Sequence, residues 1–458
     1  MKTVIMAGGK GTRIASVASD IPKPMIKVCG KPILEWQIEN LRSCELTDIT
    51  LVTGHLGHVI RDYFGDGKQL GVTISYFEET QPLGTAGALF CMPELMEGDD
   101  DFLLMCGDII VDVDFNRFLR FHREHNAWAS LMAHPNGHPY DSSLLITETL
   151  PPTQSGGCPV ETHLVTGWLN KEDKRLYYKN RVNAGIEIIS SRLLRAVREQ
   201  LVPRHPDQPG KIDLDRDVLK PSLASGRIFA YDTSEYIKDM GTPDRLHEVE
   251  RDIASGKVTA RNLREKQRAI FLDRDGTLNR YVGFLTTPEQ LELLEGAAEA
   301  VKAINASKFL AVVITNQPVI ARGECSWEQL QTIHHKLETE LGREGAFVDA
   351  IYVCPHHPDK GFEGERPEYK FDCDCRKPKA GLLLQAAADM NISLADSYII
   401  GDDMRDVQAG INAGCKDSIR IETNLPGALF DAVRQLIDSI KPETANAKKS
   451  PLFLGRLP

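Results

Sequence analysis

Two carboxylates stand at positions i and i+2 directly after an apolar run. Asp273 and Asp275 follow Ala269–Leu272. In an extended segment this spacing places both side chains on one side of the backbone. One carboxylate could then attack phosphorus or hold a cation, while the other exchanges a proton. Asp-x-Asp-Gly also occurs in turns and in calcium loops, but the further ligands and the late Glu that a calcium loop needs are absent.

Other polar groups follow these carboxylates in a set order. They are Ile314-Thr315-Asn316 after an apolar run, Arg376-Lys377-Pro378, and Gly401-Asp402-Asp403 with Asp406. Together with Phe271–Leu278, this series resembles the haloacid-dehalogenase superfamily. The resemblance implies that Asp273 forms an aspartyl-phosphate and that Asp275 acts as general acid and then as base.

The same resemblance implies a metal and a phosphate site. Mg²⁺ would bind Asp273, the backbone carbonyl of Asp275, and Asp402. Thr315 and Lys377 would bind the oxygens of the transferring phosphoryl group. Lys377 would also offset the negative charge of the clustered carboxylates.

Four potential metal ligands stand in two close pairs. The pairs are Cys354/His356 and Cys373/Cys375, with sixteen residues between them. Three thiolates and one imidazole are a recognised tetrahedral zinc set, and a site without an open position is structural. The segment between the pairs is polar, so a metal would organise it. His357 is the alternative ligand to His356.

This zinc loop leads directly into Arg376-Lys377-Pro378. Over about residues 268–440 the arrangement resembles the heptose 1,7-bisphosphate phosphatase subgroup, which is related to histidinol-phosphate phosphatases. The resemblance implies that Asn316, Gln317 and Arg376 contact the substrate. The sequence departs from the subgroup at Pro318-Val319, where Ser-Gly is usual, and at Asp403, where Lys is common. These departures could alter the substrate loop or the metal shell.

A glycine-rich loop follows the first apolar run, Thr3–Ala7. It reads Ala7-Gly8-Gly9-Lys10-Gly11-Thr12-Arg13. Glycines let backbone N–H groups approach and cradle a polyphosphate. No Gly-Lys-Ser/Thr closes the loop, so it is neither a P-loop nor a dinucleotide fingerprint. Lys23, held between two prolines, could reach a phosphate.

Over about residues 1–250 the chain resembles the sugar-1-phosphate nucleotidyltransferase family. The matching segments are Ala7–Arg13, Pro22–Pro24, Gln81–Gly87 (with Gly84 and Thr85), Cys106–Asp108, Asn183–Ile186 and Asp239–Pro243. The resemblance implies base recognition near Gly84 and Thr85, and sugar contact by Asn183. Lys171 stands where the family often has a Glu-Lys pair, although Asn170 precedes it here.

The implied transferase reaction requires no protein nucleophile. A sugar 1-phosphate oxygen attacks the α-phosphorus of a nucleoside triphosphate, and pyrophosphate leaves. Mg²⁺ between Asp108 and Asp239 would hold the reacting groups. Arg13 and Lys23 would stabilise the charge that develops on phosphorus.

The bulk composition limits the class of protein. The 458 residues carry a net charge of −11, which argues against a general nucleic-acid binder. No apolar run approaches the roughly 18 residues of a membrane span, and the first apolar run is too short for a signal peptide. The seven cysteines outside the metal-ligand pairs are scattered singly, which suits the reducing cytoplasm. We therefore expect a cytoplasmic enzyme, compatible with a homo-oligomer, that uses sugar phosphates and a nucleoside triphosphate.

Short, nearly continuous apolar runs alternate with helical patterns in both halves, which predicts α/β sheets covered on both faces. We expect the strands at 3–7, 49–53, 72–77, 102–106, 129–133, 269–272, 310–315, 350–354 and 398–401. We predict a Rossmann-like, GT-A-like transferase domain with a mixed sheet at 1–255, followed by a linker at 256–267. A haloacid-dehalogenase-type domain, with a Rossmannoid parallel sheet and a zinc loop, follows at 268–440. A flexible tail is expected at 441–458.

Together the two halves suggest consecutive reactions. The leading hypothesis is removal of the 7-phosphate of D-glycero-D-manno-heptose 1,7-bisphosphate, followed by nucleotidyl transfer, by family analogy from GTP, to heptose 1-phosphate. A second hypothesis assigns both activities to a hexose phosphate such as mannose 1-phosphate. A third makes one domain a catalytically silent scaffold or sensor.

Overall fold

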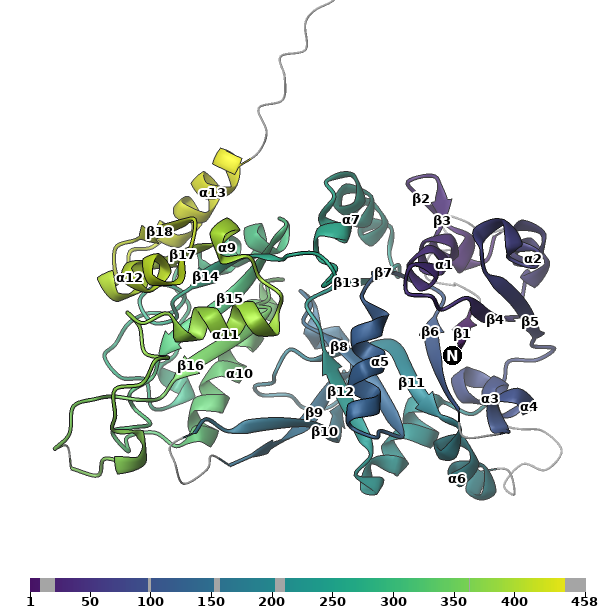
Figure 1. The fold of residues 1–458 in the computed structure, drawn as a ribbon, viewed down its shortest axis with the longest axis horizontal. Coiled ribbons are helices and arrows are strands. Elements are labelled where there is room, and N and C mark those ends of the chain that lie inside the picture. Colours follow the sequence, from purple (N-terminus) through teal and green to yellow (C-terminus); the bar gives the residue numbers. More distant parts are fainter. Residues whose placement is uncertain (9–20, 98–99, 152–156, 202–210, 362, 441–458) are drawn as a thin grey trace, which may run out of the picture.

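A computed structural model describes residues 1–8, 21–97, 100–151, 157–201, 211–361 and 363–440. Two α/β units lie side by side and share an extensive boundary (Figure 1). The predicted fold class, a mixed sheet followed by a parallel sheet, is confirmed. Among the described residues, no helix is both long and apolar enough to cross a membrane.

The first unit contains a nine-stranded mixed sheet. In spatial order its strands are β5 (Thr73–Glu78), β4 (Asp48–Thr53), β1 (Lys2–Met6), β6 (Asp101–Cys106), β11 (Val182–Ser190), β8 (Ala129–His134), β12 (Ile228–Asp232), β10 (Val160–Leu169) and β9 (Leu144–Leu150). The strands from β5 to β6 pair in parallel, whereas β11 runs antiparallel to both β6 and β8. The reversal at β11 makes the sheet mixed.

Helices surround this sheet, with α7 (Pro243–Ala254) beside the small strand β13 (Tyr236–Asp239) (Figure 1). Further helices are α1 (Ile33–Ser43), α2 (Gly57–Phe64), α3 (Gly84–Phe90), α4 (Pro93–Met96), α5 (Phe115–Glu124), α6 (Ser191–Leu201) and α8 (Lys257–Ala260). Two small antiparallel pairs complete the unit: β7 (Ile109–Asp112) with β13, and β2 (Lys27–Val28) with β3 (Lys31–Pro32). The β7–β13 pair brings the residues after β6 next to those that lead into α7.

The second unit contains a five-stranded, all-parallel sheet. Its spatial order is β16 (Ala350–Cys354), β15 (Phe309–Asn316), β14 (Arg268–Leu272), β17 (Tyr398–Gly401) and β18 (Asp417–Arg420). The surrounding helices are α9 (Ala297–Asn305), α10 (Trp327–Arg343), α11 (Gly381–Asp389), α12 (Met404–Ala413) and α13 (Ala428–Ile440). Because β14 is central and parallel to its neighbours, the polar residues after β14, β15 and β17 meet at one edge of the sheet.

The burial of the strands accounts for the continuous apolar runs in the sequence. Every residue from Ala269 to Leu272 and from Leu310 to Ile314 is fully or almost fully buried. Strands buried on both faces need apolar side chains at every position. A capping box of Ser326 and Gln329 begins α10, where Gln329 N donates to Ser326 Oγ.

The connector between the units is buried on both sides of an exposed segment at 264–266. Arg261 and Asn262 are 3% and 2% exposed, and Gln267 is 1% exposed. The Arg261 guanidinium forms an ion pair with Asp349 of the second unit at 2.7 Å and donates to the Phe309 carbonyl at 2.8 Å. Such buried pairing holds the two units in a defined relation.

Candidate active sites

Three carboxylates converge at the carboxyl edge of the parallel sheet. Asp273 follows β14, Asp402 follows β17, and Asp406 lies in the first turn of α12. Oxygen atoms of all three lie within 4.8 Å of one another. Ligand oxygens around one Mg²⁺ stand roughly 3–4 Å apart, because each bond is about 2.1 Å long. The donor type and spacing therefore fit a magnesium ion.

Lys377 lies among these carboxylates. Its Nζ atom is 2.8 Å from Asp273 Oδ1 and 2.6 Å from Asp406 Oδ1, and it donates to the Ile314 carbonyl at 2.8 Å. Burial raises the pKa of Asp273 to about 7, with a further contribution from the charge of Asp406, although Lys377 opposes the shift. Burial acts to lower the pKa of Lys377, but its two carboxylate partners outweigh this effect and raise it. The lysine is thus held as a cation beside the predicted nucleophile.

The Asp275 carboxylate points to a different set of partners. It accepts hydrogen bonds from Arg274 at 2.8 Å, Gln317 at 2.7 Å and Asn279 at 2.9 Å. Arg274 is fully buried, and its Nη1 lies 3.0 Å from Nε2 of His334. Burial, and then the charge of Arg274, lowers the pKa of His334 well below its ordinary value, which keeps the ring neutral as an acceptor. This network fixes the orientation of Asp275.

The predicted substrate residues surround the same edge. Gln317 donates to Thr315 Oγ1 at 2.8 Å, and Asn316 exchanges hydrogen bonds with the backbone of Lys377. Arg376 is half-buried, and its guanidinium donates to the His356 carbonyl at 3.1 Å. The structure therefore brings the sequence-predicted phosphatase residues into one region.

Gly276 shows how tightly this loop packs. Its φ is +84°, and a Cβ there would lie 2.3 Å from Asp402 Oδ2. Only glycine combines this backbone conformation with such a close approach. The Asp402 carboxylate can thus lie directly against the loop that carries Asp273 and Asp275.

The Cys/His group forms a compact cluster beside this edge. Separations among Cys354 Sγ, His356 Nδ1, Cys373 Sγ and Cys375 Sγ run from 3.1 to 3.8 Å. A tetrahedral zinc ion with bonds of about 2.3 Å needs ligand separations of about 3.7 Å. His357 lies outside the cluster, and its Nδ1 accepts from Asp359 N at 3.2 Å. The four residues can hold a tetrahedral metal ion.

In the first unit, two carboxylates lie on adjoining strands. Asp108 precedes β7 and Asp239 ends β13, and Met240 N donates to the Asp108 carbonyl at 2.9 Å. Each carboxylate has its own cation: Lys23 Nζ is 2.5 Å from Asp108 Oδ2, and Arg245 forms an ion pair with Asp239. The structure thus brings together the backbones of the two predicted metal ligands, and their side chains pair separately.

The rest of the predicted transferase site is described in part. Gly9, Gly11, Thr12 and Arg13 lie outside the described residues. Ala7 is buried and donates to the Val52 carbonyl at 2.8 Å, and a Cβ on Gly8 would lie 2.8 Å from Glu79 Oε2. Lys171 lies on an exposed turn after β10, with Nζ 3.7 Å from Glu172, and does not line the cavity described next.

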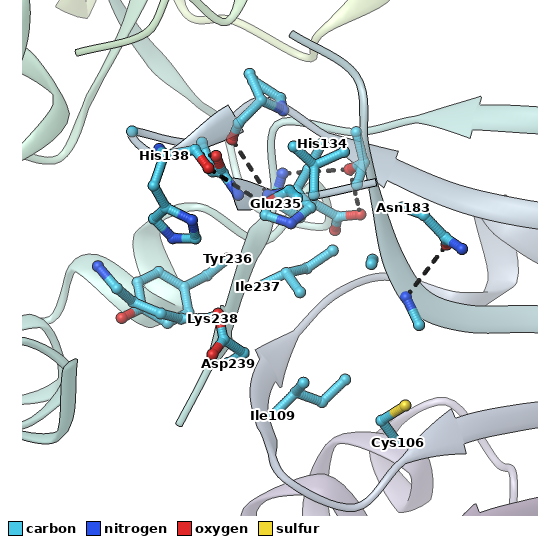
Figure 2. A pocket seen from close by; sticks show the side chains of 18 of the residues that line it. Cys106, Ile109, His134, His138, Asn183, Glu235, Tyr236, Ile237, Lys238 and Asp239 are labelled. Atoms are coloured by element: carbon cyan, nitrogen blue, oxygen red, sulfur yellow. Dashed lines mark hydrogen bonds between the residues drawn. The ribbon is translucent and has the colours of Figure 1, made fainter. Parts of the chain in front are cut away.

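A cavity of about 640 Å³ opens beside Asp239 (Figure 2). Asn183 and Thr85 line it, and Thr85 Oγ1 accepts from Leu214 N at 2.7 Å. Gly84, at a φ of +78°, packs against the Ile212 backbone, where a Cβ would lie 2.3 Å from the carbonyl oxygen. The predicted base-recognition loop therefore lies against the segment that begins at Ile212.

Two carboxylates in this cavity had no motif to mark them. Burial raises the pKa of Asp215 to about 6, with help from Asp213, while a hydrogen bond from Asn183 opposes the shift. Glu187 on β11 is also buried, and its pKa is raised well above the ordinary value. Both groups lie beside the predicted sugar contact.

Two family models match the chain, one in each unit. The nucleotidyl transferase family model matches residues 2–141, and the HAD-hydrolase-like model matches residues 374–422. A solved structure of HddC from Yersinia pseudotuberculosis, complexed with GMP-PN, covers 55% of this chain and 99% of its own, at 22% identity and a TM-score of 0.44.

Curated relatives match the second unit. The D-glycero-beta-D-manno-heptose-1,7-bisphosphate 7-phosphatase of Pasteurella multocida is 41% identical over 161 residues, which are 35% of this chain and 84% of that protein. The protein of the same name from Escherichia coli K12 is 37% identical over 158 residues, 34% of this chain and 81% of its own length. Through its second unit, the chain belongs to this heptose-bisphosphate phosphatase family.

The chain is therefore a fusion of a nucleotidyltransferase domain and a haloacid-dehalogenase-type phosphatase domain, and both domains are enzymatic. The two departures noted in the phosphatase sequence have structural reasons. Val319 is 1% exposed and fills the apolar core. Asp403 caps α12, accepting from Arg405 N at 2.8 Å, and pairs with the Arg405 guanidinium at 2.9 Å. Asp403 acts as a helix cap and ion-pair partner here.

The sequence patterns gave Asp406 no separate role and did not identify Arg245. Asp406 was noted only as part of a motif, yet it shares Lys377 with Asp273. Arg245 was not predicted, because its meeting with Asp239 depends on the turn into α7. The sequence signal that could have identified Arg245 is its position as a basic residue six places after Asp239, a predicted metal ligand.

Proposed function

We propose that the phosphatase domain removes the 7-phosphate of D-glycero-D-manno-heptose 1,7-bisphosphate. The nucleotidyltransferase domain then transfers GMP from GTP to heptose 1-phosphate and releases pyrophosphate. The observation that carries this proposal is the Asp273–Lys377–Asp406 cluster, in a domain 41% identical to a phosphatase of that specificity. Consecutive reactions on one chain make the pairing coherent.

In the hydrolytic reaction, an Asp273 oxygen attacks the phosphorus of the 7-phosphate and the bond to the sugar oxygen breaks. Asp275, oriented by Arg274 and Gln317, gives its proton to the departing oxygen. It then takes a proton from the water that attacks the aspartyl-phosphate. Lys377 and Thr315 hold the phosphoryl oxygens through these steps.

Magnesium is the cofactor we propose for both sites. Asp273, Asp402 and the Asp275 carbonyl would hold one ion, and Asp108 with Asp239 would hold the other. Bound there, the ion would neutralise charge on the reacting phosphate. In the transferase domain, Lys23 and Arg245 would have to release the carboxylates that they now pair with.

The specificity test uses the purified full chain. We expect heptose 1,7-bisphosphate, Mg²⁺ and GTP together to give GDP-heptose, identified by mass, with phosphate and pyrophosphate released. Each other nucleoside triphosphate is tested separately. Equal rates with heptose and hexose bisphosphates would contradict the heptose assignment, and a product with another nucleotide would contradict GTP.

Zinc is the ion we propose for the Cys/His cluster. Elemental analysis of the purified chain should give one zinc per chain. The Cys375→Ser variant should lose it, whereas Cys91→Ser, at an exposed cysteine outside the cluster, should keep it. Iron in place of zinc would contradict the assignment. None of the ten cysteines, all of which lie in the described residues, forms a disulfide, which supports a reducing cytoplasmic location.

A further inference from the structure

The phosphatase domain supplies one wall of the transferase cavity. Besides Asn183, Asp239 and Tyr236 of the transferase (Figure 2), the cavity is lined by Lys302, Asn305, Ala306, Gly345, Phe347 and Asp349. These six residues lie at the end of α9 and between α10 and β16. They form the amino edge of the parallel sheet, opposite the edge that carries Asp273. The wall is therefore separate from the phosphatase site.

This wall is in close contact with the transferase loop that follows β8. A Cβ on Gly137 would lie 2.8 Å from the Gly345 carbonyl oxygen, and a Cβ on Gly342 would lie 2.7 Å from Pro139 Cγ. Nearby, Tyr178 N donates to Thr339 Oγ1 at 3.0 Å. One of these contacts joins backbone to backbone and the others involve side chains of both domains, so the wall is closely packed against the transferase domain.

Lys302 differs in its ion pairing from the other cationic side chains that line the cavity. Four of its cations are paired with carboxylates: Lys238 with Glu248, Arg245 with Asp239, Lys257 with Asp252, and Arg261 with Asp349. Lys302 also lines the cavity and is exposed. Within the described parts of the chain, no carboxylate lies within ion-pairing distance of its Nζ atom. Its charge is available to an anion.

Lys302 lies beside the loop that follows β8, and this loop contacts Arg245, the ion-pair partner of the predicted metal ligand Asp239. A Cβ on Gly345 would be 3.5 Å from Lys302 Nζ and 3.8 Å from the Gly137 carbonyl oxygen, so the three residues meet. His138 follows Gly137, and its Nδ1 is 3.3 Å from Nη2 of Arg245, the partner of Asp239. Of the glycine loop, neither Ala7 nor Gly8 lines the cavity. Asn183, the predicted sugar contact, lines the same cavity as Lys302.

We propose that Lys302, a residue of the phosphatase domain, binds the anionic sugar phosphate used by the transferase domain. The proposal rests on the nucleotidyltransferase function proposed above. An ammonium group at the mouth of a cavity attracts a phosphate and can donate a charge-assisted hydrogen bond to it. The transferase site is then completed by the neighbouring domain.

The test compares kinetics of full-length variants with heptose 1-phosphate and GTP. Lys302→Ala should raise the KM for heptose 1-phosphate about 10-fold, the size expected for one lost hydrogen bond to a charged group. The KM for GTP should stay unchanged. Lys302→Glu should raise the KM for heptose 1-phosphate further, and Lys302→Arg should restore most of the affinity.

Two controls separate the possible failures. Lys416→Ala removes an exposed lysine just before β18, outside the cavity, and should leave the transferase KM values unchanged. Phosphate release from heptose 1,7-bisphosphate should be the same in every variant, which shows that the phosphatase domain is folded. If wild-type protein makes no nucleotide sugar, the proposed function fails. If wild-type protein is active and Lys302→Ala keeps its KM, or shifts only the KM for GTP, the Lys302 proposal is overturned.

Discussion

In the phosphatase domain one lysine, Lys377, holds two carboxylates at once, whereas the transferase domain pairs each predicted metal ligand with its own cation. The phosphatase group gathers at one edge of a single parallel sheet, with Asp273 after β14 and Asp406 in the first turn of α12. The transferase cavity instead uses a small antiparallel pair, the α7 turn and a wall from the other domain. One site is complete within its domain, and the other depends on its neighbour.

This difference between the two sites predicts which substitutions should impair each activity. At the phosphatase site, burial and ion pairing set the carboxylates in place before substrate binds. At the transferase site, Arg245 and Lys23 would have to exchange their partners for the proposed metal ion to bind Asp108 and Asp239. Changes within the phosphatase centre should therefore abolish one activity, and changes at the domain boundary should affect the other.

The largest effect is expected from Asp273→Asn. Removing the nucleophile should lower the phosphatase kcat by about 10⁴-fold or more, as loss of a catalytic nucleophile does in other enzymes. Nucleotidyl transfer from supplied heptose 1-phosphate should be unaffected. Phosphate and pyrophosphate release, measured on the same preparation, give both results. Persistent phosphatase turnover would mean that Asp273 is not the nucleophile.

Asp349→Ala addresses the boundary between the domains. It leaves the buried Arg261 without its carboxylate, which should destabilise the protein by about 3–5 kcal/mol. Urea unfolding followed by both activities should show transferase activity lost at a lower urea concentration than phosphatase activity. If the variant, like the wild type, lost both activities at the same urea concentration, the dependence of the transferase site on the phosphatase domain would be contradicted.

Asp108→Asn tests the first site directly. Removing one charge that would hold the metal should reduce nucleotidyl transfer by roughly 10²–10³-fold, the size typical for loss of one electrostatic contact to a transition state. The phosphatase rate should not change, which serves as the folding control. Unaltered synthesis of the nucleotide sugar would remove Asp108 from the site.

The smallest effect concerns Glu235, which lines the transferase cavity and binds the connector. Its Oε1 accepts from Asp114 N at 2.7 Å and from Leu263 N at 2.8 Å. Burial raises its pKa from 4.5 to about 7. The folded state thus binds this proton more tightly than the unfolded state, so its stabilising effect is complete below pH 4.5 and is lost as the pH rises through 7.

Glu235→Gln mimics the protonated form at every pH. The variant should match wild type near pH 4.5 and be more stable by about 1–3 kcal/mol at pH 8, as measured by chemical denaturation. Asp141→Asn, at a half-exposed carboxylate beside His138, serves as the control and should show no such divergence. Parallel stability curves for Glu235→Gln and wild type would contradict the assignment.

Much of the phosphatase site was predictable because parallel strands place their carboxyl ends at one edge. Asp273, Thr315 and Asp402 each follow a continuous apolar run, so order along the chain implied proximity in space. The zinc-type cluster was readable for a similar reason, since its ligands form two local pairs.

The transferase site was less predictable because its partners meet through non-local geometry. The β11, β12 and β13 strands had no recognised apolar run, and β13 meets β7 only after more than a hundred intervening residues. Lys302 lies on an ordinary helix and belongs to no motif. Its place in the cavity arises from the packing of Gly345 against Gly137, which no pattern within either domain encodes.

The amino edge of the phosphatase sheet faces the transferase cavity, and its catalytic residues stand at the other end of strands about 17 Å long. On the proposed function, the phosphatase product would leave at the edge opposite the transferase cavity and would reach that cavity through solvent. Joining the two enzymes then keeps their amounts equal, and a competing enzyme added outside should be able to intercept the intermediate.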